Sequence, residues 1–440
     1  DGKQGRIDVF NPVSTLSLTG TITASDTDTQ AGTKLVKSGP GTLVLDADNS
    51  TSLAADTEVE SGTLTLRASA GLGTGDLTLA DGSSLLLGHG VDIANNITLT
   101  GDATIGLTIQ PIDVEYLIVG GGGGGGPNLG GGGGAGGFIE GQSTLGDPNY
   151  TVIVGAGGAG GTGTSAVGKD GGDSAFLGET AVGGGGGGYA SAKGGGGGSG
   201  GGDGARADDN SGNTGGPGTV GQGNAGGGDN NPGSTNAGGG GGGGAGGPGQ
   251  DNSSNTKAGD GGLGLASSIT GQEIFYAGGG GGGFDIRTSS TGTSGGSDVG
   301  GTGAYRGTAG NASTDVNATD GAANTGSGGG GGAGGGATGD HATGGDGGSG
   351  IVVIRYQGET FATGGTISSF VGDGTIGESG VTYTVHSFTI GQGDTIDATT
   401  NSASYEFALD YSNLSATISG NITGSHKLTT DAGDGTLTLA

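Results

Sequence analysis

Runs of consecutive glycine are the feature that most restricts what this chain can fold into. Glycine supplies 124 of 440 residues, whereas its average share in proteins is about 7%. About two in five residues between positions 117 and 350 are glycine, and polar loops of variable length separate the runs. A region so poor in side chains cannot build a conventional apolar core, so its buried backbone groups need another arrangement of partners.

Two arrangements fit such runs. One is a flexible linker, because low hydrophobicity is typical of disorder. The other is a bundle of left-handed threefold helices that rise about 3.1 Å per residue, in which the missing Cβ lets neighbouring helices hydrogen-bond sideways. Collagen is excluded, because the chain has only 8 Pro and no strict Gly-X-Y period. Apolar segments at 114–120, 150–155, 272–278 and 350–356 adjoin the runs and favour the ordered polyglycine II bundle.

Before the glycine-rich region, the chain alternates short apolar runs with turns rich in Gly, Asn and Asp. The expected strands are residues 42–45, 63–66, 76–79, 84–87 and 96–100. Their spacing of roughly ten to twenty residues, with similar turns each time, is typical of the coils of a solenoid. We therefore predict a β-solenoid in residues 1–113.

The segment after the glycine-rich region returns to strand patterning, most clearly in residues 382–390, where apolar and polar residues alternate. Its end repeats the beginning of the chain, since Gly435-Thr-Leu matches Gly41-Thr-Leu. The predicted fold is mainly β with essentially no α-helix. It has solenoid- or sandwich-like modules at 1–113 and 357–440, which flank a polyglycine II bundle at 114–356.

Two stretches resemble known families. The segments KSGPGTLVLDADNST (37–51), VESGTLTL (59–66), GLGTGDLTLADGSSLLL (71–87) and IANNITLTGDATI (93–105) resemble the passenger repeats of bacterial autotransporters. This resemblance implies a parallel β-helix on a cell surface.

The second resemblance covers about 240 residues. YLIVGGGGGG at the start of the glycine-rich region and GGDGGSGIVVIRY at its end resemble the glycine-rich domain of phage tail-fibre adhesins. That resemblance implies a sandwich of polyglycine II helices whose loops carry receptor specificity.

Composition narrows the function further. Cys and Met are absent, so disulfides and thiol chemistry are excluded, and an extracellular or cell-surface location is expected. The formal charge of −29 argues against binding to nucleic acid. No stretch approaches 18 apolar residues, so we expect no membrane insertion, and any export signal or anchor is expected outside this sequence.

Two glycine-rich motifs suggest nucleotide binding, but neither has the required context. Residues 152–160 fit Gly-x-Gly-x-x-Gly after a strand, yet more glycine follows where the dinucleotide fold needs a helix. Residues 163–170 are one residue short of a Walker A loop, and Asp170 stands where Ser or Thr should bind Mg²⁺. No Ser/His/Asp constellation can be nominated either. We expect no enzyme activity and no catalytic residue.

Metal and cofactor sites are also not expected. The four histidines are isolated from one another, with no zinc-binding spacing. Calcium at the acidic pairs Asp26/Asp28, Asp46/Asp48 and Asp208/Asp209 is the one alternative, although these lack the EF-hand loop and the nine-residue calcium repeat.

The sequence therefore predicts a structural segment of an extracellular fibre, joined head to tail to copies of itself or to adjacent repeats. The candidate module contacts are Leu43, Leu45, Leu437 and Leu439. The alternative is a receptor-binding adhesin, from a bacterial surface or a virion tail fibre, that contacts a cell-surface glycan or protein. Its specificity would lie in the loops at 206–214, 251–257 and 284–297, with Tyr189, Phe284 and Tyr305 as candidate receptor contacts.

Overall fold

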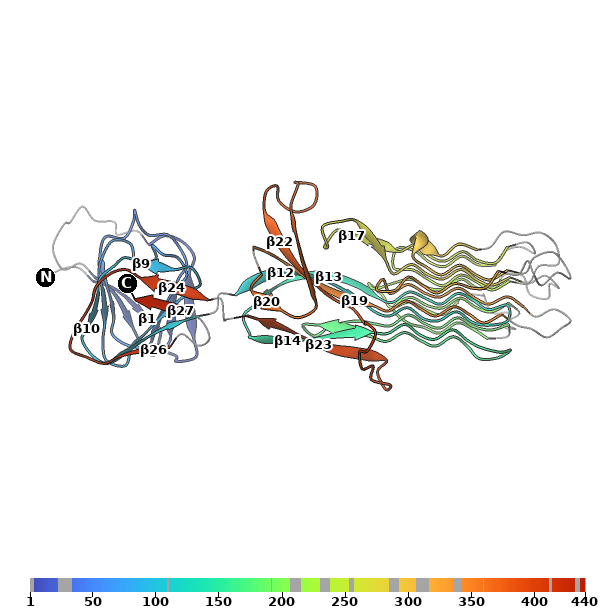
Figure 1. Cartoon of the computed structure of the whole chain (residues 1–440), viewed down its shortest axis with the longest axis horizontal. Coiled ribbons are helices and arrows are strands. Elements are labelled where there is room, and N and C mark those ends of the chain that lie inside the picture. The colour runs from blue at the N-terminus through green and yellow to red at the C-terminus, as the bar shows by residue number, and fades with distance from the viewer. Residues whose placement is uncertain are drawn as a thin grey trace. The chain divides into compact units, whose positions relative to one another are not determined.

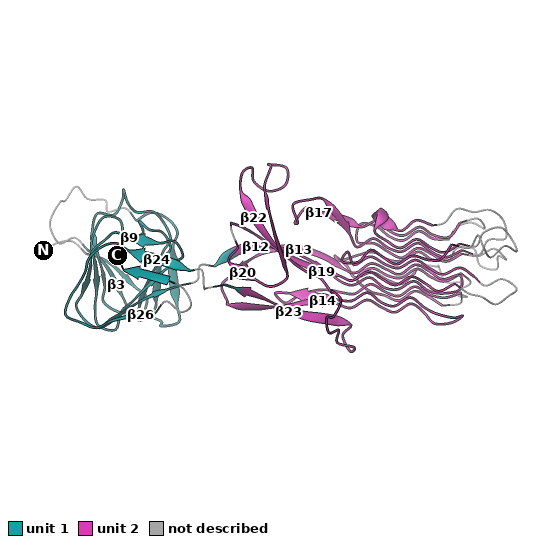
Figure 2. Cartoon of the chain, in the orientation of Figure 1, with its two compact units in different colours: residues 1–112, 409–440 teal, residues 113–408 magenta. Residues whose placement is uncertain are grey.

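The chain forms two compact units, which Figure 2 colours separately. The solenoid unit consists of residues 1–112 and 409–440, and the glycine-rich unit of residues 113–408. A computed structural model describes residues 4–22, 34–108, 111–190, 192–205, 215–229, 238–252, 257–284, 293–305, 316–334, 342–358, 360–410, 414–431 and 436–439. The chain leaves the solenoid unit once and returns to it once, so the glycine-rich unit is an insertion.

This division differs from the three consecutive modules expected from the sequence. Residues 357–408 add strands to the sheets of the glycine-rich unit, and residues 409–440 complete the solenoid unit. The expected module at 357–440 is thus shared between the two units. The reason is strand pairing between segments far apart in the chain, which the composition of the tail does not reveal.

The solenoid unit has three parallel sheets, whose strands follow one another along each coil (Figure 1). The first contains β1 (Gln4–Asp8), β3 (Lys34–Ser38), β5 (Asp56–Val59), β7 (Leu77–Leu79), β10 (Ile97–Leu99) and β25 (Ile422–Thr423). The second contains β2 (Thr15–Leu18), β4 (Thr42–Leu45), β6 (Thr63–Leu66), β8 (Ser84–Leu87), β11 (Ala103–Leu107) and β26 (Leu428–Asp431). The third contains β9 (Asp92–Ile93), β24 (Ser415–Ile418) and β27 (Thr436–Leu439).

Stacked leucine side chains form the core of the solenoid unit. Leu43 pairs with Leu64, Leu64 with Leu85, and Leu85 with Ile105, and all four are fully buried. An apolar residue at every second position of these strands, such as Leu43 and Leu45 or Leu85 and Leu87, points into the core. Each buried leucine contributes roughly 1.5–3 kcal/mol by leaving water. The sequence pattern therefore produces both the strands and the register of the stack.

A ladder of Asp and Asn side chains connects successive coils at one corner of the solenoid. The main-chain N–H of Asp76 donates to Asp56 Oδ1 at 3.0 Å, and that of Asn96 donates to Asp76 Oδ1 at 3.2 Å. The next N–H in the ladder belongs to Asn421, which donates to Asn96 Oδ1 at 3.2 Å. The ladder thus continues in register across the insertion, and residues after 409 form the coil that follows β11.

This continuity explains why the end of the chain repeats its beginning. The matching Gly-Thr-Leu motifs begin β4 and β27, which are strands of one solenoid in different sheets. The recurrence comes from coils that share the same pattern of turn and strand.

Two antiparallel sheets pack together in the glycine-rich unit. One has the order β13 (Phe138–Leu145), β12 (Ile112–Val119), β19 (Ile351–Gln357), β22 (Thr382–Phe388) and β21 (Thr366–Val371). The other has the order β16 (Glu179–Ala181), β15 (Ser174–Phe176), β14 (Asn149–Gly155), β23 (Ser402–Leu409) and β20 (Ala362–Thr363). Edge-to-face ring contacts join the sheets, including Tyr116 with Phe176 at 5.8 Å and His386 with Phe407 at 5.0 Å.

The glycine runs extend from these sheets as long undulating traces that lie side by side in Figure 1. Runs follow directly after β12 and β14, and another ends directly before β19. No described glycine in segments 120–126, 130–137, 183–188 or 344–350 has a positive φ. These glycines are therefore required for their missing side chain and not for the left-handed region of backbone space.

The predicted fold class is confirmed: the protein is mainly β, with a solenoid, sandwiched sheets and a polyglycine II bundle. A separate ribbon of β17 (Leu265–Ser267) and β18 (Ile274–Tyr276) completes the glycine-rich unit. The described residues contain one short 3₁₀ helix, η1 (Gly296–Asp298), and no α-helix.

The insertion predicts that the solenoid folds without the glycine-rich unit. Replacing residues 113–408 by a short Gly-Ser linker should leave a cooperatively folding solenoid, because β24, β25 and β26 pair directly with β9, β10 and β11. Hydrogen exchange should show the amides of Asn421 and Lys427 protected as in the full chain. A matched variant that also lacks residues 414–440 should lose protection of the amides in β10 and β11. Unprotected Asn421 and Lys427 amides in the first variant would contradict the continuous solenoid.

Candidate interaction surfaces

Segment 120–126 shows how the bundle satisfies its backbone. Its N–H groups donate, over 2.8–3.0 Å and with a period of three residues, to carbonyls on three neighbouring segments: 131–137, 169–172 and 345–348. Its carbonyls accept, over 2.7–3.0 Å, from three others: 158–161, 184–187 and 329–332. The three-residue period is that of a threefold helix, and the segment is surrounded by six neighbours.

A side chain cannot enter this lattice. A Cβ on Gly122 would lie 2.1 Å from the carbonyl oxygen of Ser327, and one on Gly124 would lie 2.2 Å from that of Ala159. Both distances are far below van der Waals contact, and the neighbouring atoms belong to backbone that is itself hydrogen-bonded on other sides. The interior of the bundle is therefore closed to side chains and ligands. Recognition has to use its loops or the side chains of the sheets.

The three aromatic residues proposed as receptor contacts have different surroundings. Phe284 is only 3% exposed and packs against Ala258, so its ring does not form part of the surface. Tyr305 is half-buried against the same cluster, and Tyr189 is also half-buried. Of these three residues, only the two tyrosines are therefore partly exposed to solvent. The loop at 206–214 lies outside the described residues, as do 253–256 and 285–292 of the other two loops.

The Gly-x-Gly-x-x-Gly motif at 152–160 forms part of the bundle. The N–H of Gly158 donates to Gly122 O at 2.8 Å, and the N–H of Gly160 donates to Asp346 Oδ1 at 2.7 Å. In the Walker-like segment, Asp170 Oδ1 accepts the N–H of Gly186 at 2.8 Å. The amides of Gly158 and Gly160 and the carboxylate of Asp170 are thus used within the fold.

Arg355 on β19 lines a shallow groove of about 370 Å³ together with residues of β12, β13 and the segment 267–269. Its guanidinium pairs with Glu115 and donates to Ser268 O at 3.3 Å. It also lies over the rings of Phe370 and Tyr383, at 5.8 and 5.1 Å from their centroids. Arg355 thus connects the β17–β18 ribbon to the sheet. Sequence reasoning missed this residue because an arginine in a strand gives no sign of its partners.

His386 is fully buried where the two sheets meet. Its Nε2 lies 3.0 Å from the Tyr356 hydroxyl, and its Nδ1 lies 2.8 Å from Gly364 O. Nδ1–H therefore donates to the carbonyl and Nε2 accepts from the tyrosine, an arrangement that requires neutral imidazole. Burial lowers the pKa of His386, against a smaller opposite effect of the Gly364 carbonyl, and burial raises the pKa of Tyr356 to about 12.

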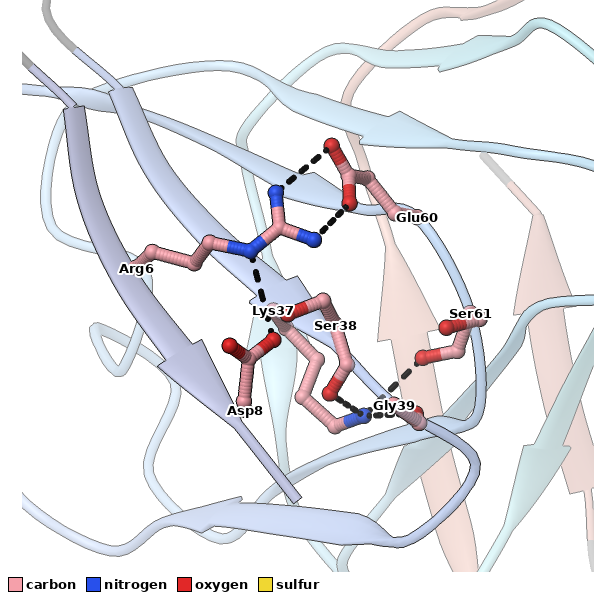
Figure 3. Close-up of polar contacts among 7 residues, drawn as sticks. All are labelled: Arg6, Asp8, Lys37, Ser38, Gly39, Glu60 and Ser61. Atoms are coloured by element: carbon pink, nitrogen blue, oxygen red, sulfur yellow. Dashed lines mark hydrogen bonds and ion pairs between the residues drawn. The ribbon is translucent and has the colours of Figure 1, made fainter. Parts of the chain in front are cut away.

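A buried lysine fixes a corner of the solenoid (Figure 3). The ammonium of Lys37 donates to the carbonyl oxygens of Ser38, Gly39 and Ser61 over 2.7–3.0 Å, so its three protons have three acceptors. Burial lowers the pKa of Lys37, and the Asp8 carboxylate opposes that shift. Lys37 therefore links its own coil, through Ser38 and Gly39, to the next coil, through Ser61.

The same figure shows an exposed ion pair beside Lys37. The Arg6 guanidinium holds Glu60 across coils at 2.8 Å and Asp8 at 3.2 Å. Because Arg6 is half-exposed, this pair contributes little to stability.

The four leucines proposed as module contacts divide into two kinds. Leu43 and Leu45 are fully buried in the solenoid core, so they do not reach a surface in this fold. Leu437 is half-buried on β27, and Leu439 is 49% exposed there. Only the β27 pair therefore remains accessible to a neighbouring module.

Among the described residues, no group of three or more His, Asp and Glu side chains could hold a metal ion. Of the acidic pairs considered for calcium, Asp46 lies 3.7 Å from Arg67, and Asp48 Oδ1 accepts the N–H of Ser50 at 2.8 Å. Asp26, Asp28, Asp208 and Asp209 lie outside the described residues. The described part contains no helix long and apolar enough to cross a membrane.

Comparison with known proteins gives one match. A family model described as a glycine-rich domain matches residues 98–357, which is more than half of the chain. The match includes the end of the first part of the solenoid and runs to the end of β19. No curated protein and no solved structure gave a significant match.

The close packing of the glycine helices predicts a large loss of folding stability when one methyl group is added to an interior glycine. Gly124→Ala should destabilise the glycine-rich unit by about 3 kcal/mol or more, because its Cβ would overlap hydrogen-bonded backbone. Gly247→Ala is the matched control, since the nearest atom to its Cβ lies at 3.8 Å and the change should be within about 0.5 kcal/mol. Thermal unfolding and amide exchange of segment 120–126 measure both. Equal stability of the two variants would disprove the close lateral packing.

The buried histidine predicts a loss of stability in acid. Unfolded chains protonate histidine near pH 6.5, whereas the folded unit resists protonation because burial lowers the pKa of His386. The free energy of unfolding should therefore fall as the pH drops below about 6.5, until the folded-state pKa is passed. His386→Gln should flatten this part of the profile, and His426→Gln, at an exposed position, is the matched control. Identical pH profiles for both variants would contradict the assignment.

Proposed function

Because the chain belongs to the glycine-rich domain family through residues 98–357, we propose that it is a structural segment of an extracellular or cell-surface fibre. The solenoid unit would form the shaft, and the glycine-rich unit would be carried as an insertion between two of its coils. Both units rely on repeated backbone hydrogen bonds, which suits a part that resists deformation.

The open strand edges of the solenoid unit carry this proposal. In the described part, β1 and β2 each pair on one side only at one end of their sheets. At the other end, β25, β26 and β27 each pair on one side only. Unpaired parallel edges favour addition of another coil. Contact between opposite ends is heterologous, so it gives an open filament.

Exposed apolar side chains lie beside one of these edges. Phe10 is 80% exposed, Val13 87% and Leu16 41%, and they lie in β2 or in the segment that joins β1 to β2. Leu439 on β27 is 49% exposed at the opposite end. A neighbouring coil, in the same longer chain or in another copy, would cover these side chains.

A receptor-binding role is the second candidate, and the topology of the insertion favours it. The ladder from Asn96 to Asn421 closes without help from the glycine-rich unit, so that unit is free to serve recognition. Its partners would be a cell-surface glycan or protein, and a virion tail fibre is then the alternative location. The groove beside Arg355 and the loops of the bundle offer the side chains for such contacts.

Electron microscopy and sedimentation of the purified chain test the fibre. We expect filaments or head-to-tail oligomers, and the double variant Phe10→Asp with Val13→Asp should disperse them, because charged side chains would be buried at the joint. Val220→Asp is the matched control, since Val220 is 98% exposed on the other unit. Monomeric wild-type chain would overturn a joint between separate copies, and assembly unaffected by the double variant would overturn a joint at Phe10 and Val13.

Deleting residues 113–408 separates the two roles. A shaft function predicts that the shortened chain still assembles, and a receptor function predicts that it no longer binds cells to which the full chain adheres.

A further inference from the structure

Strand β21 is an open edge of the sheet β13-β12-β19-β22-β21 in the glycine-rich unit. It pairs with β22 from Thr366↔Ser387 to Val371↔Thr382, and it is the last strand of the sheet order. In Figure 1 the hairpin that contains β22 extends beyond the neighbouring ribbons. Among the described residues, no hydrogen bond outside the β22 ladder involves the backbone of residues 366–371. Its outer row of N–H and C=O groups is therefore available to another strand.

The side chains of β21 do not protect that edge. Natural edge strands commonly carry charges, prolines or bulges that prevent pairing. The sequence of β21, Thr-Ile-Ser-Ser-Phe-Val, has neither charge nor proline. Ile367 is 43% exposed and Val371 is 61% exposed, with exposed Ser369 between them on the same face. Phe370 on the other face is held by stacking on Tyr383, with ring centroids 5.2 Å apart.

We infer that β21 pairs in antiparallel fashion with β21 of a second copy of this chain, centred on Ser369. The sheet that ends in β21 would then join the same sheet of the second copy, and a twofold axis would relate the two. This contact lies on a different unit from the head-to-tail joint and does not depend on the fibre proposal.

The strand itself selects the register. A twofold axis normal to the sheet keeps each side chain on the same face in both copies, so only positions of equal parity can lie opposite each other. Centring on Ser369 places Ile367 opposite Val371 of the other copy at two symmetric places. Centring on Ser368 would place Ile367 opposite Ser369 and leave Val371 uncovered. The register at Ser369 is the one that buries both exposed apolar side chains against each other.

The neutrality of the β21 edge makes it the place where a second copy can pair. The chain carries 42 acidic and 13 basic residues, so most of its surface repels another copy. The edge of β21 is neutral and matches an equally neutral strand, whereas it offers no charge to select an acidic or basic peptide. Added salt screens the remaining repulsion, so the dissociation constant of the dimer should fall as salt rises.

A charge swap at the centre tests the pairing. The full chain carrying Phe10→Asp and Val13→Asp, which blocks the solenoid joint, is examined by sedimentation velocity, and a monomer–dimer equilibrium is expected. Ser369→Lys and Ser369→Glu, at an exposed position, should each weaken the dimer at least tenfold, because like charges would lie directly opposite. An equimolar mixture of the two variants should restore dimers of mixed composition.

Ser368→Lys and Ser368→Glu provide the matched control, since residue 368 would lie opposite Phe370 and not opposite itself. Their mixture should show no such rescue. Circular dichroism checks that every variant is folded. A parent chain that stays monomeric at high salt would overturn the inference. This includes a chain that binds an extended peptide along β21 in place of a second copy. A dimer unaffected by Ser369→Lys, or rescue at position 368 in place of 369, would also overturn it.

Discussion

The lateral hydrogen bond between glycine helices is the interaction on which the glycine-rich unit depends. Each residue of segment 121–126 donates to one neighbour and accepts from another, so no helix of the bundle is satisfied alone. Ordering a residue costs about 1–2 kcal/mol, and glycine lies at the upper end. A net hydrogen bond contributes about 0.5–1.5 kcal/mol. This near balance explains why the helices adjoin strands: β12 and β14 fix the first residues of the runs that follow them, and β19 fixes the last residues of the run before it. The lattice extends from this aligned base.

Periodicity made much of this fold predictable. Short runs rich in Thr and Leu, with Leu at every second position, predicted the strands at 42–45, 63–66 and 84–87, because one buried face imposes a period of two. The glycine runs predicted the bundle, because only a residue without Cβ tolerates its lateral distances. The same regularity, however, means that the sequence does not show which strands pair with which. Residues 63–66 and 436–439 have the identical sequence Thr-Leu-Thr-Leu, so local pattern cannot assign them to different sheets or show that an insertion separates their coils.

The candidate sites were less predictable, for a related physical reason. Lys37, Arg355 and His386 are single polar residues whose roles depend on atoms from distant segments, and a lone polar residue has no periodic signal. Phe284 was a candidate receptor contact because it lies in a glycine-rich loop, where packing over the bundle was the alternative, and its ring packs beside Ala258. In a region with so few large side chains, each aromatic ring is valuable for packing, which competes with a role in recognition.

The chemistry of the bundle restricts where the glycine-rich unit can recognise anything. A glycine helix presents only peptide groups, and in segment 120–126 these are already bonded to six neighbours. Peptide groups also repeat identically along a run, so they cannot distinguish one ligand from another. Specificity has to come from side chains, which occur in the loops between helices and on the sheets at the base. Substitutions in those places alter the surface without entering the lattice, whereas a methyl group at Gly122 or Gly124 meets backbone at about 2 Å. The unit therefore separates its framework from its variable surface more completely than a fold with a side-chain core, in which packing and surface often share residues.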